Sequence, residues 1–163
     1  MIKFGPAGNC KTFYDEGFKR TIEAPKWLNA HGLDAYEYSF GKGFTLPDET
    51  AIKIGEEMKK YGITISIHAP YYINFATPTD EMAEKSYGYV LESLRKLRLI
   101  GGNQLVVHPA SQGKMTREEA IALTKKRLNI LKDKIIENGY DDMYVCLETM
   151  GKSMQIGTVD EIL

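Results

Sequence analysis

Three strand-like stretches each end in a residue that can bind a metal, and this pattern constrains the fold more than any other feature. Isoleucines alternate with polar residues over residues 63–68, which end in His68, and comparable stretches end in His108 and Glu148. Because side chains alternate between the two faces of a strand, all three end residues are expected on one face of a sheet. Their spacing of 40 residues is the length of one strand-plus-helix unit.

The whole chain alternates between short strands and amphipathic helices, which predicts an α/β fold with a parallel sheet. Thr116 with Glu119 forms a capping box, and Asp48 is expected to cap another helix. Strands are predicted near Ile2–Gly5, Ala35–Tyr38, Ile63–His68, Gln104–His108 and Met143–Leu147, and helices near Thr21–His31, Asp48–Tyr61, Thr79–Ile100 and Thr116–Asn138.

An open doubly wound sheet and a TIM (β/α)8 barrel both fit this alternation. Strands of an open sheet have helices on both faces and read as nearly continuous apolar runs. Here one face of each strand is mixed polar, which is typical of a barrel interior near its active mouth. We therefore predict that residues 1–163 are the N-terminal portion of a single barrel domain with about five of eight βα units. The missing C-terminal half is expected in a longer polypeptide of about 250 residues or more.

Composition limits the classes of protein that the chain can belong to. With 43% hydrophobic and 26% charged residues, it is expected to be globular. It lacks a run of roughly 18 apolar residues, so no membrane span is predicted. Cys10 and Cys146 match no metal-ribbon or redox spacing, which favours a reducing, cytoplasmic location. A net charge of −1 gives no general argument for nucleic-acid binding.

Two imidazoles and a carboxylate are a suitable ligand set for zinc, with manganese or iron(II) as less suitable alternatives. Taken singly, each residue has a simpler interpretation as an isolated, hydrogen-bonded polar group. Two of the chain's three histidines, however, occupy equivalent strand ends beside a carboxylate. We therefore predict a metal site on His68, His108 and Glu148. The third histidine, His31, is expected to end a helix, and Glu37 is either a pocket carboxylate or a rim ion-pair partner.

Three separate motifs resemble the endonuclease IV family of apurinic/apyrimidinic endonucleases. They are His68-Ala69-Pro70-Tyr71 with Ile73-Asn74, His108-Pro109-x-Ser111, and a strand ending in Glu148. The resemblance implies a zinc-dependent, xylose isomerase-like barrel that cleaves DNA 5′ to an abasic site at a trinuclear centre. It implies that His68 and His108 bind one zinc, and that Glu148 bridges this zinc to a second and is catalytic. It places the substrate near Tyr71, Asn74 and Ser111.

The sequence departs from the family pattern in two motifs. The family usually has His-Pro-Gly-Ser, and this chain has Ala110 in place of the glycine. The family usually has Glu-Asn-Thr, and this chain has Glu148-Thr149-Met150. These departures indicate a divergent member, and the family's later Asp, His and Glu ligands are not in the sequence. The truncated chain alone is therefore expected to be inactive. A metal-dependent sugar isomerase or epimerase of the same barrel group is the alternative, and a non-catalytic metal-binding remnant is a third.

Four lysines fall in loops that should open on the metal-bearing edge. Lys11, Lys42, Lys114 and Lys152 follow the first, second, fourth and fifth predicted strands. Cations in these positions could bind DNA phosphates even when the net charge is near zero, although scattered solvated lysines are the alternative. The lysines, with the tyrosine and asparagine after the first histidine, favour DNA over a sugar as substrate.

Overall fold

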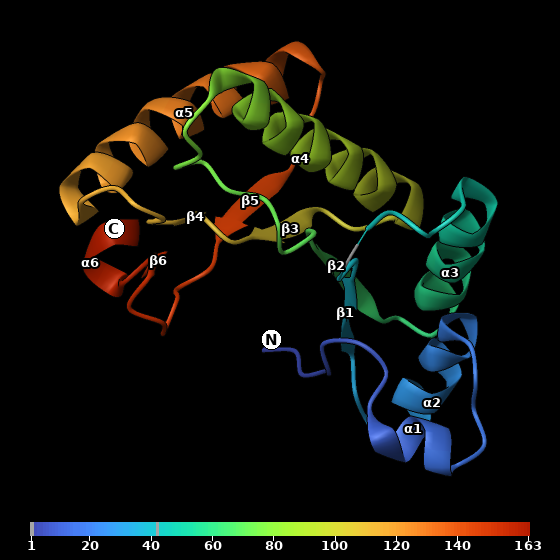
Figure 1. The fold of residues 1–163 in the computed structure, drawn as a ribbon. Coiled ribbons are helices and arrows are strands. Elements are labelled where there is room, and N and C mark those ends of the chain that lie inside the picture. The colour runs from blue at the N-terminus through green and yellow to red at the C-terminus, as the bar shows by residue number, and fades with distance from the viewer. Residues whose placement is uncertain (1, 42) are drawn as a thin grey trace.

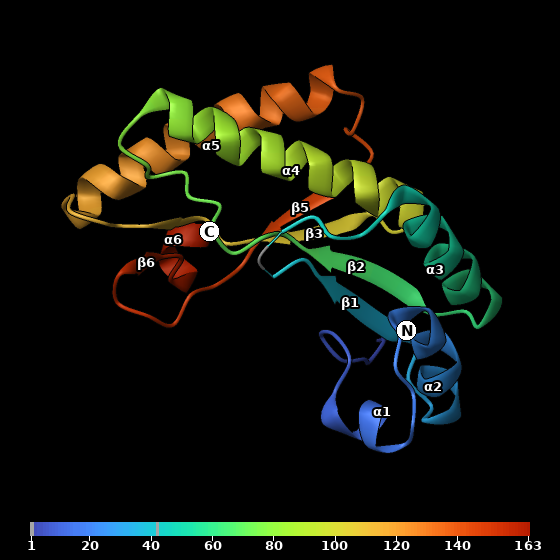
Figure 2. The ribbon, with the colours of Figure 1, turned by 45° about the vertical axis from the view of Figure 1, so that its right-hand side comes forward.

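A four-stranded parallel sheet forms the centre of the computed structural model, which describes residues 2–41 and 43–163. The strand order is β1-β2-β3-β5, and successive strands are connected through helices, as parallel pairing requires. Figures 1 and 2 show α3, α4 and α5 arranged along one side of the curved sheet, while both chain ends lie on the other side. The strands are β1 (Ala35–Ser39), β2 (Thr64–His68), β3 (Gln104–Val107) and β5 (Tyr144–Leu147).

The predicted helices are present, and the short helices α1 and α6 are additional to them. The helices are α1 (Lys11–Asp15), a 3₁₀ turn (Thr21–Glu23), α2 (Ala24–Ala30), α3 (Asp48–Lys60), α4 (Asp80–Ile100), α5 (Arg117–Glu137) and α6 (Val159–Ile162). The helix expected over residues 21–31 is thus divided, with Pro25 in the first turn of α2, where its missing N–H is tolerated. Within the part of the chain that the structure describes, none of the helices has the length and apolarity needed to cross a bilayer.

The two predicted helix caps have different outcomes. Thr116 caps α5 in a capping box with Glu119, as predicted. The prediction that Asp48 is an N-cap was wrong, because Pro47 occupies that position. The Asp48 carboxylate instead accepts two hydrogen bonds of 2.8 Å from Arg95 on α4, in a bidentate pair.

Strand alternation divides the sheet into an apolar outer face and a mixed polar inner face, as predicted. Ile65 and Ile67 on β2 and Leu105 and Val107 on β3 are buried beneath the helices. Burial of each such side chain stabilises the fold by about 1.5–3 kcal/mol. Ser66 and the other residues of opposite parity lie on the inner face, which ends at the candidate metal ligands.

The first predicted strand, Ile2–Gly5, is not a strand. Its residues lie beside β1, but the Phe4 carbonyl accepts from the adjacent amides of Asp34 and Ala35, at 3.0 and 3.1 Å. A regular parallel ladder does not bring two consecutive amides to one carbonyl. The extended segment makes a single parallel bridge further on, between Ala7 and Glu37.

A close backbone approach at Gly5 gives a testable consequence. A β-carbon at this position would overlap the Ala35 carbonyl oxygen, so Gly5→Ala forces the two backbones apart. We expect the free energy of unfolding to fall by about 1–3 kcal/mol, as in other overpacked sites. Gly88 in α4 is the matched control, because a β-carbon there meets nothing within 4 Å. Gly88→Ala should stabilise the helix by about 0.5–1 kcal/mol. Urea unfolding measures both changes, and a Gly5→Ala variant as stable as wild type would contradict the close approach.

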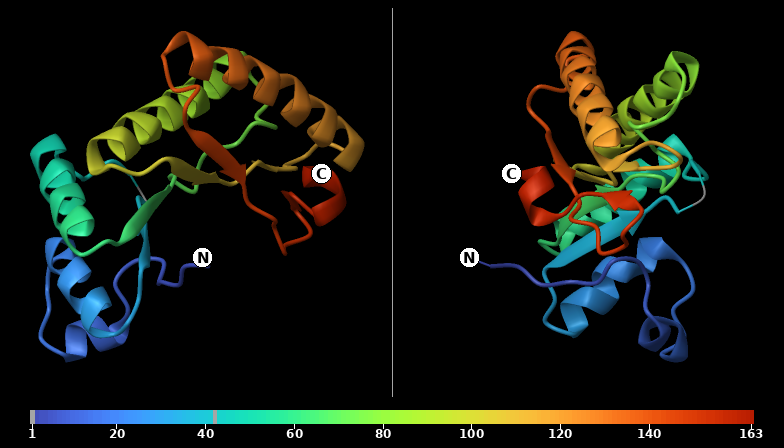
Figure 3. Two further views of the ribbon diagram at one scale, coloured as in Figure 1. Left: turned by 180° about the vertical axis from the view of Figure 1, so that it is seen from behind. Right: turned by 60° about the vertical axis from the view of Figure 1, so that its left-hand side comes forward.

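A second, antiparallel sheet lies beyond the carboxyl ends of the main strands and was not predicted. It pairs β4 (Ala110–Ser111) with β6 (Gln155–Ile156). The chain after β5 turns back so that β6 and α6 lie near the start of α5 (Figure 3). Arg117 of α5 holds this segment through a bidentate contact with Glu161, with distances of 2.7 and 2.8 Å.

Candidate metal centre

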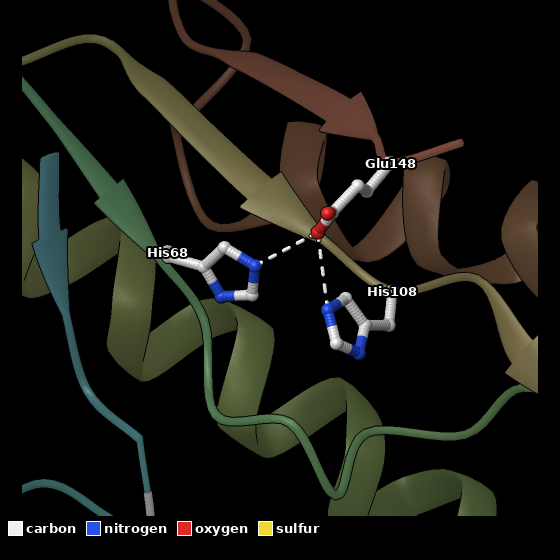
Figure 4. A group of neighbouring side chains, drawn as sticks. All are labelled: His68, His108 and Glu148. Atoms are coloured by element: carbon white, nitrogen blue, oxygen red, sulfur yellow. Dashed lines mark hydrogen bonds and ion pairs between the residues drawn. The ribbon is translucent and has the colours of Figure 1, made fainter. Parts of the chain in front are cut away.

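Three side chains from neighbouring strand ends converge on one point (Figure 4). Oε2 of Glu148 lies 2.9 Å from Nε2 of His68 and 3.0 Å from Nε2 of His108. One ligand atom from each residue lies within 4.8 Å of the other two. Ligand atoms around a tetrahedral zinc lie about 3.4 Å apart if each is about 2.0–2.2 Å from the ion. A small outward rotation of these side chains would therefore make room for one ion.

Parallel pairing brings the three residues to the same height. His68 is the last residue of β2 and pairs with Val106 of β3. His108 follows β3 directly, and Glu148 follows β5, with its amide donating to the Val107 carbonyl at 3.0 Å. The predicted convergence of the three side chains at the carboxyl edge of the sheet is thus present in the structure.

The chemistry of the donor set fits a divalent metal. Nδ1 of His68 lies 2.8 Å from the Ala69 carbonyl oxygen, which only accepts, so Nδ1 carries the proton. Nε2 of the same ring faces Oε2 of Glu148 at the convergence point. Burial lowers the pKa of His108, partly opposed by the charge of Glu148. A lowered pKa favours the neutral imidazole, which is the form that binds a metal.

The loops after β2 and β3 hold the other residues that the resemblance assigned to the substrate. Tyr71 is exposed beside Tyr72, with 5.8 Å between their ring centroids. Asn74 and Ser111 are brought together, because Oδ1 of Asn74 accepts from the Ser111 amide at 3.1 Å. The Ser111 hydroxyl also donates to the Met154 carbonyl at 3.4 Å. Contact of these residues with a substrate stays a prediction.

Of the predicted phosphate-binding lysines, Lys114 and Lys152 lie in the expected loops, whereas Lys11 is the first residue of α1. Lys11 begins α1 and lies 2.6 Å from the carboxylate of Asp15, which offsets part of its charge. Lys114 and Lys152 are exposed in the loops before α5 and β6. Lys42 lies outside the described residues. Binding of DNA phosphates by the lysines stays a prediction.

Two further polar residues considered in the sequence form hydrogen bonds with residues other than the metal ligands. His31 caps the end of α2, with Nδ1 2.8 Å from the Trp27 carbonyl and Nε2 3.1 Å from Glu16. This confirms its expected place at a helix end. Glu37 lies within β1 on the inner face, where the Ser66 hydroxyl donates to it at 3.5 Å.

One buried charge that contacts the loop after His68 was not predicted from the sequence. Arg127 on α5 is 4% exposed and donates to the carbonyls of Phe75 and Thr77 in the loop after His68, as well as to Asp80 at 3.2 Å. The burial of Arg127 could have been inferred from the sequence, because it lies at helical spacing from the other residues that α5 buries. The residues that α5 buries are Ala120, Thr124, Arg127 and Leu131.

Comparison with known proteins finds one family match over most of the chain. The family described as xylose isomerase-like TIM barrel matches residues 25–163. An uncharacterised protein of Methanocaldococcus jannaschii is 33% identical over 165 aligned positions, which cover 100% of this chain and 56% of that protein. A probable endonuclease 4 of Acholeplasma laidlawii is 34% identical over 157 positions, covering 91% of this chain and 51% of its own. This relative confirms the resemblance to endonuclease IV.

A solved structure places the fold among complete TIM barrels. D-Psicose 3-epimerase, solved in the presence of D-fructose, superposes on 96% of this chain with a TM-score of 0.72. The chain covers 55% of that enzyme at 12% sequence identity, a likeness that concerns the fold alone. The chain also spans about half the length of the two curated relatives. The predicted TIM-barrel class is confirmed, and the four-stranded parallel sheet forms part of such a barrel.

Proposed function

Because this chain belongs to the xylose isomerase-like TIM barrel family, we propose that it provides part of the metal centre of an endonuclease acting on abasic DNA. The proposal depends on the convergence of His68, His108 and Glu148 at the carboxyl edge of the sheet. Zinc suits two imidazoles and a carboxylate best, and manganese or iron(II) are alternatives. The name of the Acholeplasma laidlawii relative supports a DNA substrate.

The proposed reaction is hydrolysis of the phosphodiester 5′ to an abasic site. Bound zinc would supply a Lewis acid and lower the pKa of a water molecule. The imidazoles of His68 and His108 would hold the ion together with Glu148. Glu148 directs Oε2 at both rings, and its carboxylate would accept a proton from the attacking water. Tyr71 would stack beside the abasic site, Asn74 and Ser111 would lie near the backbone, and Lys11, Lys42, Lys114 and Lys152 would bind phosphates.

The rest of the active site is proposed to come from further βα units of a longer polypeptide. An apolar groove of about 400 Å³ lies between α5 and β5. It is lined by side chains that a buried interface would cover, among them Leu128, Leu131, Ile135, Met143 and Val145. A neighbouring unit packed there would close the barrel next to Glu148. We also propose a cytoplasmic location, with which the free thiols of Cys10 and Cys146 agree.

A sugar isomerase or epimerase is the second candidate. A polar hollow of about 480 Å³ on the inner face, lined partly by Glu37 and Ser66, has the size of a small-ligand site. The same hollow includes Thr64 and Gln104, which begin β2 and β3, so it lies toward the end of the strands opposite the metal ligands. Because the hollow lies away from the metal ligands, a sugar isomerase or epimerase is the weaker candidate function.

Cleavage of a defined DNA duplex tests the proposed function. The full-length protein loaded with zinc should cut a duplex 5′ to a single abasic site, leave an undamaged duplex intact, and lose activity after chelation. A polypeptide of these 163 residues alone should cleave little or nothing, because it provides about half the length of its relatives. Epimerisation of a ketohexose without DNA cleavage would favour the second candidate and contradict the first.

A further inference from the structure

We infer that Asn74 is a positioning residue of the metal centre, a role that rests on the proposed function. Its side-chain oxygen accepts from the backbone amides of Ala76 at 2.9 Å and Ser111 at 3.1 Å. These two amides belong to the loops that follow His68 and His108. Both acceptor positions of Oδ1 are thus used: the bond from Ala76 holds the turn of the loop after His68, and the bond from Ser111 joins this loop to the segment after His108.

The backbone of Asn74 is itself held on α4. Its amide donates to the hydroxyl of Ser86 at 3.3 Å, and the same hydroxyl lies 3.3 Å from the Asn74 carbonyl. Ser86 is 5% exposed. The next residue adds a second connection between the loops, because the Phe75 amide donates to the Pro109 carbonyl at 3.2 Å. Asn74 therefore connects the loop after His108 to a rigid helix and not to a mobile segment.

Hydrogen bonds continue from Ser111 to the loop that carries Glu148. Ser111 pairs with Gln155 in the β4–β6 sheet, and the next amide, of Gln112, donates to the Met154 carbonyl at 2.8 Å. The Met150 amide donates to the Gly157 carbonyl at 2.7 Å, which closes the loop after Glu148. The Asn74–Ser111 contact thus lies in the middle of a network that joins all three ligand-bearing loops.

This network predicts an effect on metal affinity that a residue contacting only DNA would not have. Loss of an outer partner that orients metal ligands typically weakens metal binding about 10–100-fold. Removal of the Asn74 oxygen leaves two amides without their acceptor and frees the loops to move relative to each other. The side-chain NH₂ group is not needed for this role, so aspartate should replace asparagine.

Co²⁺ titration of the full-length protein, followed by visible absorption and checked by zinc competition, tests this role. Asn74→Ala should weaken binding about 10–100-fold. Asn74→Asp keeps the acceptor oxygen and should retain binding at least as tight as wild type. Asn129→Ala is the matched control, because this exposed side chain donates to the Lys125 carbonyl within its own helix. Circular dichroism establishes that each variant is folded.

The outcomes distinguish the proposed function from the positioning role of Asn74. Wild-type protein that binds neither Co²⁺ nor zinc overturns the proposed function and, with it, the role of Asn74. Wild-type protein that binds metal, with Asn74→Ala binding equally well, overturns only the positioning role. If Asn74→Ala does not fold, Asn74→Asp decides alone. Wild-type affinity supports the acceptor role, and a large loss would show that the NH₂ group is the essential part.

Discussion

His108→Ala is expected to weaken zinc binding by more than about 100-fold. Loss of an outer partner of a metal ligand already costs about 10–100-fold, so loss of a ligand should cost more. The substitution leaves His68 and Glu148 at the convergence point, and two ligands are fewer than the three that a catalytic zinc site usually has. Competition with a chromophoric chelator, combined with elemental analysis, measures the change.

His31→Ala is the matched control for this variant. It removes the same chemical group, but its ring contacts Trp27 and Glu16 at the end of α2. Zinc affinity should therefore stay at the wild-type value while stability falls slightly. Equal zinc affinity in His108→Ala and wild type would remove His108 from the proposed ligand set.

Arg127→Met is expected to cause the largest loss of stability. Arg127 is 4% exposed, and its guanidinium donates to the carbonyls of Phe75 and Thr77, whose residues are 0% and 2% exposed. Methionine fills much of the same volume but leaves these carbonyls without a charged donor. Buried acceptors that lose their partner cost about 1–3 kcal/mol each, so unfolding free energy should fall by about 3 kcal/mol.

The same helix supplies the control for Arg127. Lys125 is exposed two residues earlier, and Lys125→Met should change the unfolding free energy by less than about 0.5 kcal/mol. Urea denaturation of both variants measures the difference. Equal stability of Arg127→Met and wild type would show that the loop after His68 does not depend on the buried guanidinium.

The positions of His68, His108 and Glu148 could be predicted because they depend on local signals. Strand alternation fixes the face of each side chain, and a repeating unit length fixes the height of each strand end. Parallel pairing then brings the three together without any further information from distant residues.

The first strand and the Asp48 cap could not be predicted because each depends on a distant partner. Taken alone, residues 2–5 look like a strand, but the Phe4 carbonyl accepts from the consecutive amides of Asp34 and Ala35 at the start of β1. Asp48 is well suited to capping, but Arg95 binds its carboxylate from 47 residues away. In both places a tertiary contact outweighs the local preference.

The joining of the loops was missed for a related reason. The amides that Asn74 binds include one that lies 37 residues later in the chain, and the two-residue strands of the β4–β6 sheet are too short to show alternation. Burial of Arg127, in contrast, follows from the helical spacing of α5 and could have been predicted from the sequence.

Anomalous diffraction at the zinc absorption edge, from crystals of the zinc-loaded full-length protein, tests the proposed metal centre most directly. We expect a peak about 2.0–2.2 Å from Nε2 of His68, from Nε2 of His108 and from a carboxylate oxygen of Glu148. The Glu148 oxygen should then no longer lie 2.9 and 3.0 Å from the two imidazole nitrogens. Zinc peaks only at other residues, with these three side chains still in direct contact, would contradict the proposed centre.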